Sequence, residues 1–82
     1  MLILYVKTGC PYCEQVRRYA EGASILLHER DIADPAIDTE LIHKGGMRQV
    51  PFLDDTDYRV QMYESDDIVE YLRQKYERGA IG

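Results

Sequence analysis

Cysteine is scarce in this sequence: the 82 residues include only two, and tryptophan is absent. Two cysteines cannot build the disulfide framework of a small secreted domain, so we expect a dithiol in a reducing compartment. No apolar run approaches the ~20 residues that span a bilayer. The stretch from Met1 to Tyr5 lacks a basic region and a small-residue cleavage site, so no signal peptide is expected. These absences predict a cytoplasmic protein without a membrane partner.

Positive charge is also in short supply. Lys and Arg number 10 against 15 Asp and Glu, which gives a net charge of −5. Nucleic-acid binding needs clustered Lys and Arg, so we exclude it as the main function and assign the acidic balance to solubility. The length suits one domain over residues 1–82, and no repeat, low-complexity segment or internal linker interrupts it. We expect this domain to be a monomer.

Apolar runs and turn residues predict a β-α-β unit in the first part of the chain. The almost wholly apolar run over 2–6 is typical of a strand buried on both faces. Pro11 suits the first turn of a helix, and Gly22 suits its end. A second strand is expected at about 26–30. The crossover between the two strands should be right-handed.

A second helix and a hairpin are expected to follow. Asp34-Pro35 is typical of a helix start, and Lys44-Gly45-Gly46 is typical of a helix end. The Asp-rich stretch over 54–57 predicts a turn, because Asp side chains stabilise turns by local hydrogen bonds. Strands at 50–53 and 58–62 would flank that turn and form the hairpin.

A last helix completes the pattern. Ser65 is expected to cap it, with Asp66 and Asp67 in its positive first turn and Gly79 at its end. The complete order is β-α-β-α-β-β-α, which places the chain in the α/β class.

The two cysteines stand together in Cys10-Pro11-Tyr12-Cys13, between the first strand and the first helix. The thiolate is the reactive form of cysteine, and a helix start stabilises it through unpaired N–H groups and the helix dipole. Cys10 occupies that start, and Lys7 adds a positive charge nearby. Cys13 lies one turn further on, on the buried face, and should remain a thiol. We therefore predict that Cys10 attacks a disulfide and that Cys13 resolves the product.

Two simpler interpretations of the cysteine pair are less favoured. A structural zinc ion needs four ligands, and only His28 and His43 are available besides the cysteines, without finger-like spacing. No metal site is therefore expected. A purely structural pair is disfavoured because Cys10 falls at a helix start, where thiol reactivity is favoured.

The chain resembles glutaredoxins of the thioredoxin fold over its whole length. The resemblance is carried by Cys10-Pro11-Tyr12-Cys13 after a first strand, by Lys7 before it, and by two later motifs. Val50-Pro51 matches the family's cis-proline loop, and Ser65-Asp66 matches the start of its last helix. The resemblance implies a thioredoxin-like fold, with a four-stranded mixed sheet flanked by three helices.

The resemblance also implies glutathione as a co-substrate. Val50 would pair its backbone with the glutathione cysteine like an added strand, and a cis Pro51 would hold that backbone toward Cys10. Ser65 and the N–H groups of the last helix would bind the γ-glutamyl carboxylate. Asp66 or Glu64 would take the ammonium group, while Lys7 and Arg48 would face the glycyl carboxylate. The residues expected around glutathione are Lys7, Tyr12, Arg48, Gln49, Val50, Pro51, Glu64, Ser65 and Asp66.

The implied activity is that of a glutathione-dependent thiol-disulfide oxidoreductase with Cys10 and Cys13 as catalytic residues. Its expected partners are glutathione, protein disulfides and glutathionylated proteins. A thioredoxin-like protein served by a reductase is the nearest alternative within the redox class, and it would lack the polar glutathione contacts.

Two motifs keep other functions open. Many glutaredoxins have Thr before the Val-Pro pair and Gly-Gly before the last helix, where this chain has Gln49 and Tyr63-Glu64. Gln49-Val50-Pro51 and Glu64-Ser65 are similar to the N-terminal domain of glutathione transferases, in which a helical domain follows, and to transferase-like bacterial glutaredoxins. A transferase module is therefore the second hypothesis. A dimeric iron–sulfur carrier that uses glutathione as a ligand is the third.

Overall fold

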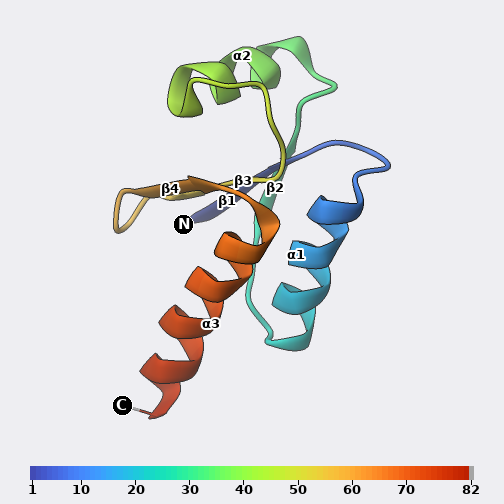
Figure 1. Cartoon of the computed structure of the whole chain (residues 1–82). Helices are drawn as coiled ribbons and strands as arrows, with labels where there is room; N and C mark the ends of the chain where they lie inside the picture. Colours follow the sequence, from blue (N-terminus) through green and yellow to red (C-terminus); the bar gives the residue numbers. More distant parts are fainter. Residues whose placement is uncertain (82) are drawn as a thin grey trace.

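Four strands form one mixed sheet in the order β2-β1-β3-β4 (Figure 1). The computed structural model describes residues 1–81. β1 pairs in parallel with β2 and antiparallel with β3, and β3 pairs antiparallel with β4. The elements in chain order are β1 (Leu2–Val6), α1 (Pro11–Gly22), β2 (His28–Asp31), α2 (Pro35–Gly45), β3 (Phe52–Asp55), β4 (Val60–Tyr63) and α3 (Ser65–Ile81). This order and this mixed sheet confirm the predicted thioredoxin-like fold.

The three helices cover both faces of the sheet. α1 and α3 lie on one face and α2 lies on the other (Figure 1). Beneath α1 and α3 is the larger core cluster, and beneath α2 a small cluster of Tyr5, Leu41 and Phe52. Within the described residues, no helix has the length and apolar character needed to cross a bilayer.

The starts of α1 and α2 follow the sequence signals closely. Cys10 and Asp34 are the N-cap residues, and a proline occupies the first turn of each helix. At the end of α2, Gly46 adopts a left-handed conformation with φ 86°, and its N–H donates to the Ile42 carbonyl at 2.8 Å. A residue without Cβ is favoured at such a position, so the predicted end of α2 is confirmed.

The predicted turn over 54–57 is wrong. Asp54 and Asp55 belong to β3 and are buried, and the turn follows them before β4 begins at Val60. The physical reason is that each carboxylate finds a cation: Lys44 reaches Asp54 at 2.8 Å and Lys75 reaches Asp55 at 2.5 Å. These long-range ion pairs override the local turn preference of Asp.

Two details of α3 also differ from the prediction. Ser65 is the first residue of the helix rather than its cap, because the carbonyl of Glu64 accepts the first helical hydrogen bond, from the Ile68 N–H at 3.0 Å. The helix also continues through Gly79 to Ile81. Glycine lowers helix stability by only about 1 kcal/mol, which is too little to force a helix to end.

Candidate functional site: a groove beside Cys10

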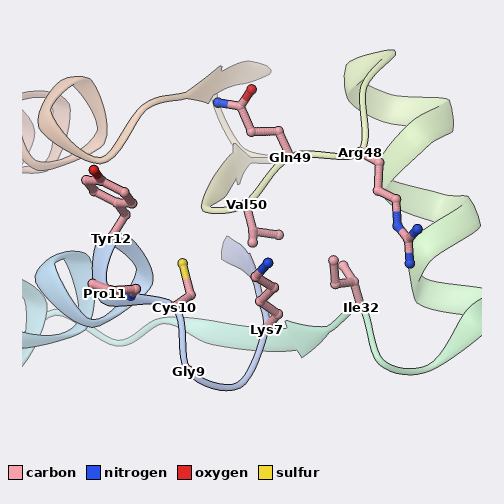
Figure 2. A pocket seen from close by; sticks show the side chains of 9 residues that line it. All are labelled: Lys7, Gly9, Cys10, Pro11, Tyr12, Ile32, Arg48, Gln49 and Val50. Carbon is pink, nitrogen blue, oxygen red and sulfur yellow. The ribbon is translucent and has the colours of Figure 1, made fainter.

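Cys10 lies where the chain turns from β1 into α1. The turn passes through Gly9, whose φ of 76° is readily adopted only by a residue without a side chain. The backbone of Cys10 is extended, and its sulfur faces a cavity of about 650 Å³ (Figure 2). Cys10 is only 7% exposed, yet its sulfur can be reached from this cavity.

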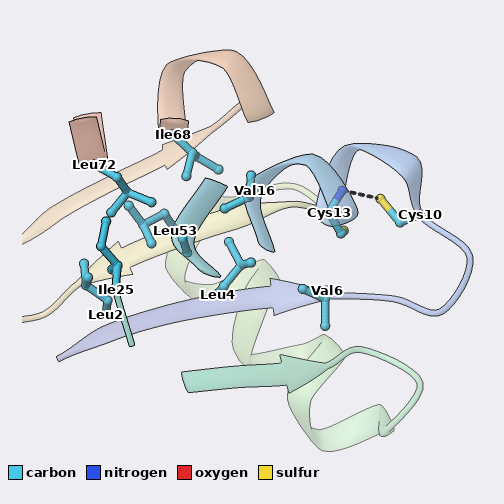
Figure 3. Packing of buried hydrophobic residues seen from close by; sticks show 11 residues of the cluster. Leu2, Leu4, Val6, Cys10, Cys13, Val16, Ile25, Leu53, Ile68 and Leu72 are labelled. Carbon is cyan, nitrogen blue, oxygen red and sulfur yellow. Dashed lines mark hydrogen bonds between the residues drawn. The ribbon is translucent and has the colours of Figure 1, made fainter. Parts of the chain in front are cut away.

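The two cysteines are linked by one short contact. The backbone N–H of Cys13 donates to Cys10 Sγ at 3.2 Å (Figure 3). This hydrogen bond is the helix-capping contact of α1, and it directs a donor at the sulfur atom. The predicted place of Cys10 at the helix start is therefore confirmed.

Cys13 occupies a different environment from Cys10. It is fully buried in the core cluster between the sheet and α1, and does not line the cavity. Burial, together with the hydrogen bond to Cys10, raises the pKa of the Cys13 thiol to about 12. Cys13 is therefore protonated at neutral pH, as the sequence predicted.

A second cavity, of about 570 Å³, continues the first toward the start of α3. Tyr12, Gln49 and Val50 line both cavities, so the two form one groove, which we call the thiol groove. All nine residues expected around glutathione line it; the first cavity holds Lys7, Tyr12, Arg48, Gln49 and Val50, and the second adds Pro51, Glu64, Ser65 and Asp66. Their role in binding glutathione stays a prediction.

The loop between α2 and β3 forms the shared wall of the thiol groove. The Val50-Pro51 peptide bond is cis, like the family loop that these two residues resemble. Val50 points into the first cavity in Figure 2, between Lys7 and Gln49. On the same loop, Arg48 pairs with Asp38 of α2 at 3.0 Å and keeps most of its side chain exposed.

Gln15 supports two groove residues, a role that the sequence did not reveal. Its amide nitrogen donates to Asp66 Oδ1 at 2.8 Å, and its amide oxygen accepts from the Ser65 hydroxyl at 3.2 Å. Gln15 thereby joins α1 to the first turn of α3. Nothing in the sequence around Gln15 indicates a partner 50 residues further along the chain.

Tyr63 is a second residue whose role was hidden. Its hydroxyl donates to the Met47 carbonyl at 2.8 Å and accepts from the Met47 N–H at 3.1 Å. Its ring packs on Phe52 with centroids 4.6 Å apart. A Cβ on Gly45 would collide with the Tyr63 hydroxyl, so glycine is needed there. Tyr63 therefore fixes the loop that carries Arg48 and Gln49.

The histidines do not join the thiols. His28 lies on β2 and His43 on α2. In the part of the chain that the structure describes, no group of three or more His, Cys, Asp or Glu residues is placed to hold a metal ion.

Comparisons with known proteins give a consistent result. The family model described as "Glutathione S-transferase, N-terminal domain" matches residues 4–79. A glutathione S-transferase from the Antarctic clam Laternula elliptica is 26% identical, with a TM-score of 0.78 over 93% of this chain and 35% of that chain. Human glutathione S-transferase T1-1 in its apo form is also 26% identical, with a TM-score of 0.78 over 94% of this chain and 33% of that chain.

A delta-class glutathione transferase from Nilaparvata lugens is similar as well. It is 25% identical, with a TM-score of 0.78 over 93% of this chain and 36% of that chain. The chain thus spans about a third of the length of these structures. No curated protein sequence matches it.

Proposed function

The chain belongs to the glutathione S-transferase N-terminal domain family, and on that premise we propose that its thiol groove binds glutathione for disulfide exchange at Cys10. The observation that carries this proposal is the pairing of the two cysteines. The Cys10 sulfur faces the groove and accepts the Cys13 N–H at 3.2 Å, while the Cys13 thiol is buried. The thiolate is the nucleophile in disulfide exchange, and of the two sulfur atoms only that of Cys10 lies on the groove.

In this proposal, glutathione lies along the thiol groove in a defined orientation. Its cysteine pairs with the backbone of Val50, in the manner of an added strand. Its glycyl carboxylate then lies toward Lys7 and Arg48, and its γ-glutamyl group lies toward Ser65 and the first N–H groups of α3. Asp66 and Glu64 line the cavity where the ammonium group lies.

Removal of glutathione from a mixed disulfide needs only Cys10. Its thiolate attacks the glutathione sulfur, the Cys10–glutathione bond forms, and the substrate leaves as a thiolate. A second glutathione thiolate then attacks the bound glutathione sulfur. Oxidised glutathione leaves, and the Cys10 thiolate is restored.

Reduction of a protein disulfide also uses Cys13. Cys10 attacks one sulfur of the substrate, and the other substrate sulfur leaves as a thiolate. Cys13 then gives its proton to that substrate thiolate and attacks Cys10 Sγ, and the second substrate sulfur leaves as a thiolate. The substrate is then released reduced, and a Cys10–Cys13 disulfide remains for glutathione to reduce.

A turnover assay with a small glutathione-mixed disulfide, glutathione and glutathione reductase tests the proposal. Cys10→Ser should abolish turnover, because it removes the nucleophile. Cys13→Ser should retain it, because Cys13 does not take part in deglutathionylation. Turnover by thioredoxin reductase but not by glutathione would contradict the proposal.

A transferase activity is the second candidate, and the family match favours it. In that case the groove would activate the thiol of glutathione for conjugation to an electrophile, and the cysteines of this chain would not exchange disulfides. A conjugation assay separates the two candidates. Conjugation that survives Cys10→Ser, without disulfide turnover, would favour the transferase.

A further inference from the structure

Charges of opposite sign line the two ends of the thiol groove. The first cavity contains Lys7 and Arg48 and has no acidic residue in its lining. The second cavity contains Glu64, Asp66 and Asp67 and has no basic residue in its lining. The groove is therefore cationic beside Cys10 and anionic beside α3.

The carboxylates at the anionic end remain available to a ligand. Glu64 accepts from the neutral amide of Gln49 at 3.1 Å, and Asp66 accepts from the neutral amide of Gln15 at 2.8 Å. Neutral donors leave the negative charge of a carboxylate in place.

At the cationic end, Lys7 is exposed and makes no ion pair within residues 1–76. Arg48 bonds Asp38 through Nε, and its side chain is 65% exposed. Lys7 can therefore pair with a ligand, and Arg48 stays largely exposed although it is paired with Asp38.

The loop that forms the wall of the groove has a defined chain direction relative to the two ends. The backbone from Arg48 to Pro51 runs from the cationic cavity to the anionic cavity. A peptide that pairs antiparallel with Val50 runs the opposite way, so its N-terminal end lies beside Glu64 and Asp66. This is the direction that glutathione takes when its ammonium group lies at the anionic end.

We propose that the thiol groove selects peptide and protein disulfides by the order of charges around the reacting cysteine. A basic residue on the N-terminal side of that cysteine and an acidic residue on its C-terminal side match the two ends of the groove. The reverse order places like charges together at both ends. This inference rests on the proposed disulfide exchange and names the substrates that the same site prefers.

Two peptides of identical composition test the order alone. One contains Lys-Cys-Glu and the other Glu-Cys-Lys within the same neutral flanks, and each carries thionitrobenzoate on its cysteine through a disulfide. The Cys10 thiolate attacks the peptide sulfur, a Cys10–peptide disulfide forms, and thionitrobenzoate leaves as a coloured thiolate. Because both peptides have the same net charge, the overall charge of −5 affects them equally.

The Lys-Cys-Glu peptide should react about tenfold faster with the reduced protein at low salt, because two exposed ion pairs replace two like-charge contacts. The preference should shrink at 1 M salt, which screens exposed charges. Lys7→Gln and Arg48→Gln should each reduce it. Arg18→Gln is the matched control, because Arg18 lies on α1, is exposed, and does not line the groove.

The outcomes separate the inference from the function on which it rests. Equal rates for the two peptides, or faster reaction of Glu-Cys-Lys, would overturn the proposed order of charges and leave disulfide exchange intact. A preference that survives both groove variants and 1 M salt would also overturn it. No release of thionitrobenzoate from either peptide, together with no turnover of a glutathione-mixed disulfide, would contradict the proposed function itself.

Discussion

Asp54 and Asp55 are neighbours in β3, but they hold helices on opposite faces of the sheet. Asp54 binds Lys44 of α2 at 2.8 Å. Asp55 binds Lys75 of α3 at 2.5 Å and also accepts from the Tyr71 hydroxyl at 2.6 Å. The carboxylate on the α3 side is completely buried and has two strong partners, whereas the carboxylate on the α2 side has one.

The packing around these carboxylates is also more extensive on the α3 side than on the α2 side. The face covered by α1 and α3 holds eleven of the buried residues in one cluster, and Cys13 is part of it. Among the residues whose burial the structure describes, the α2 face holds three, and ion pairs also attach α2 there, including Arg30 to Glu40 at 2.8 Å. Tyr5 also donates to Glu40. The thiols thus lie on the face covered by α1 and α3, which we call the apolar side. The loop after α2 depends on the packing and ion pairs of the α2 side.

The largest expected effect is on the apolar side. Leu72 is fully buried between α3 and the sheet, so Leu72→Ala should lower the free energy of unfolding by about 3 kcal/mol through lost burial and a cavity. Leu26 is 74% exposed, so Leu26→Ala is the matched control and should change stability little. Chemical denaturation measures both. Equal effects of the two substitutions would contradict the description of this core.

The paired carboxylates come next. Asp55→Asn should lower the free energy of unfolding by about 2 kcal/mol, because it removes charged hydrogen bonds from a buried site. Asp54→Asn should lower it by about 1 kcal/mol, because only one such bond is lost. Chemical denaturation of both variants measures the difference. A larger loss of stability for Asp54→Asn than for Asp55→Asn would contradict the stronger role of the buried carboxylate on the α3 side.

The two carboxylates should also differ in their response to acid. Burial alone raises the pKa of Asp55, but the hydrogen bonds from Lys75 and Tyr71 outweigh it and lower the pKa below its usual value. This contribution to stability is present above the ordinary carboxyl pKa of about 4 and is lost as the pH falls through the lowered value. Asp55→Asn should therefore weaken the loss of stability in acid. An unchanged acid profile would contradict this role of Asp55.

The smallest expected effect is on the α2 side, at Tyr63. Tyr63→Phe keeps the ring on Phe52 but removes both hydrogen bonds to Met47. The KM for glutathione should rise about fivefold with kcat nearly unchanged, because the loop that carries Arg48 and Gln49 loses about 1 kcal/mol of support. Steady-state kinetics of deglutathionylation measures both constants.

Tyr58→Phe is the matched control for Tyr63→Phe, because Tyr58 is 68% exposed and does not line the thiol groove. A fall in kcat with unchanged KM would show that Tyr63 does not act through the loop.

The sequence predicted features that local signals determine. Cys10 before Pro11 and Asp34 before Pro35 carry the chemistry of helix starts, so both helices begin where expected. Only the family resemblance indicated that the Val50-Pro51 bond is cis, because no local signal in the sequence separates cis from trans.

The sequence could not predict features that depend on distant partners. Asp54 and Asp55 have the composition of a turn, and only Lys44 and Lys75 make them strand residues. The role of Gln15 is hidden in the sequence for a related reason, since its partners lie on α3. The nine expected groove residues did converge, because the fold brings the three motifs of the resemblance to one end of the sheet.

The most direct test of the account is the site of glutathione attachment. The Cys13→Ser variant is incubated with oxidised glutathione, and peptide mapping by mass spectrometry locates the adduct. We predict one glutathionyl group, on Cys10, and none on Cys13 when Cys10→Ser is treated in the same way. Absence of an adduct on Cys10, or equal labelling of Cys13 in the Cys10→Ser variant, would contradict the account.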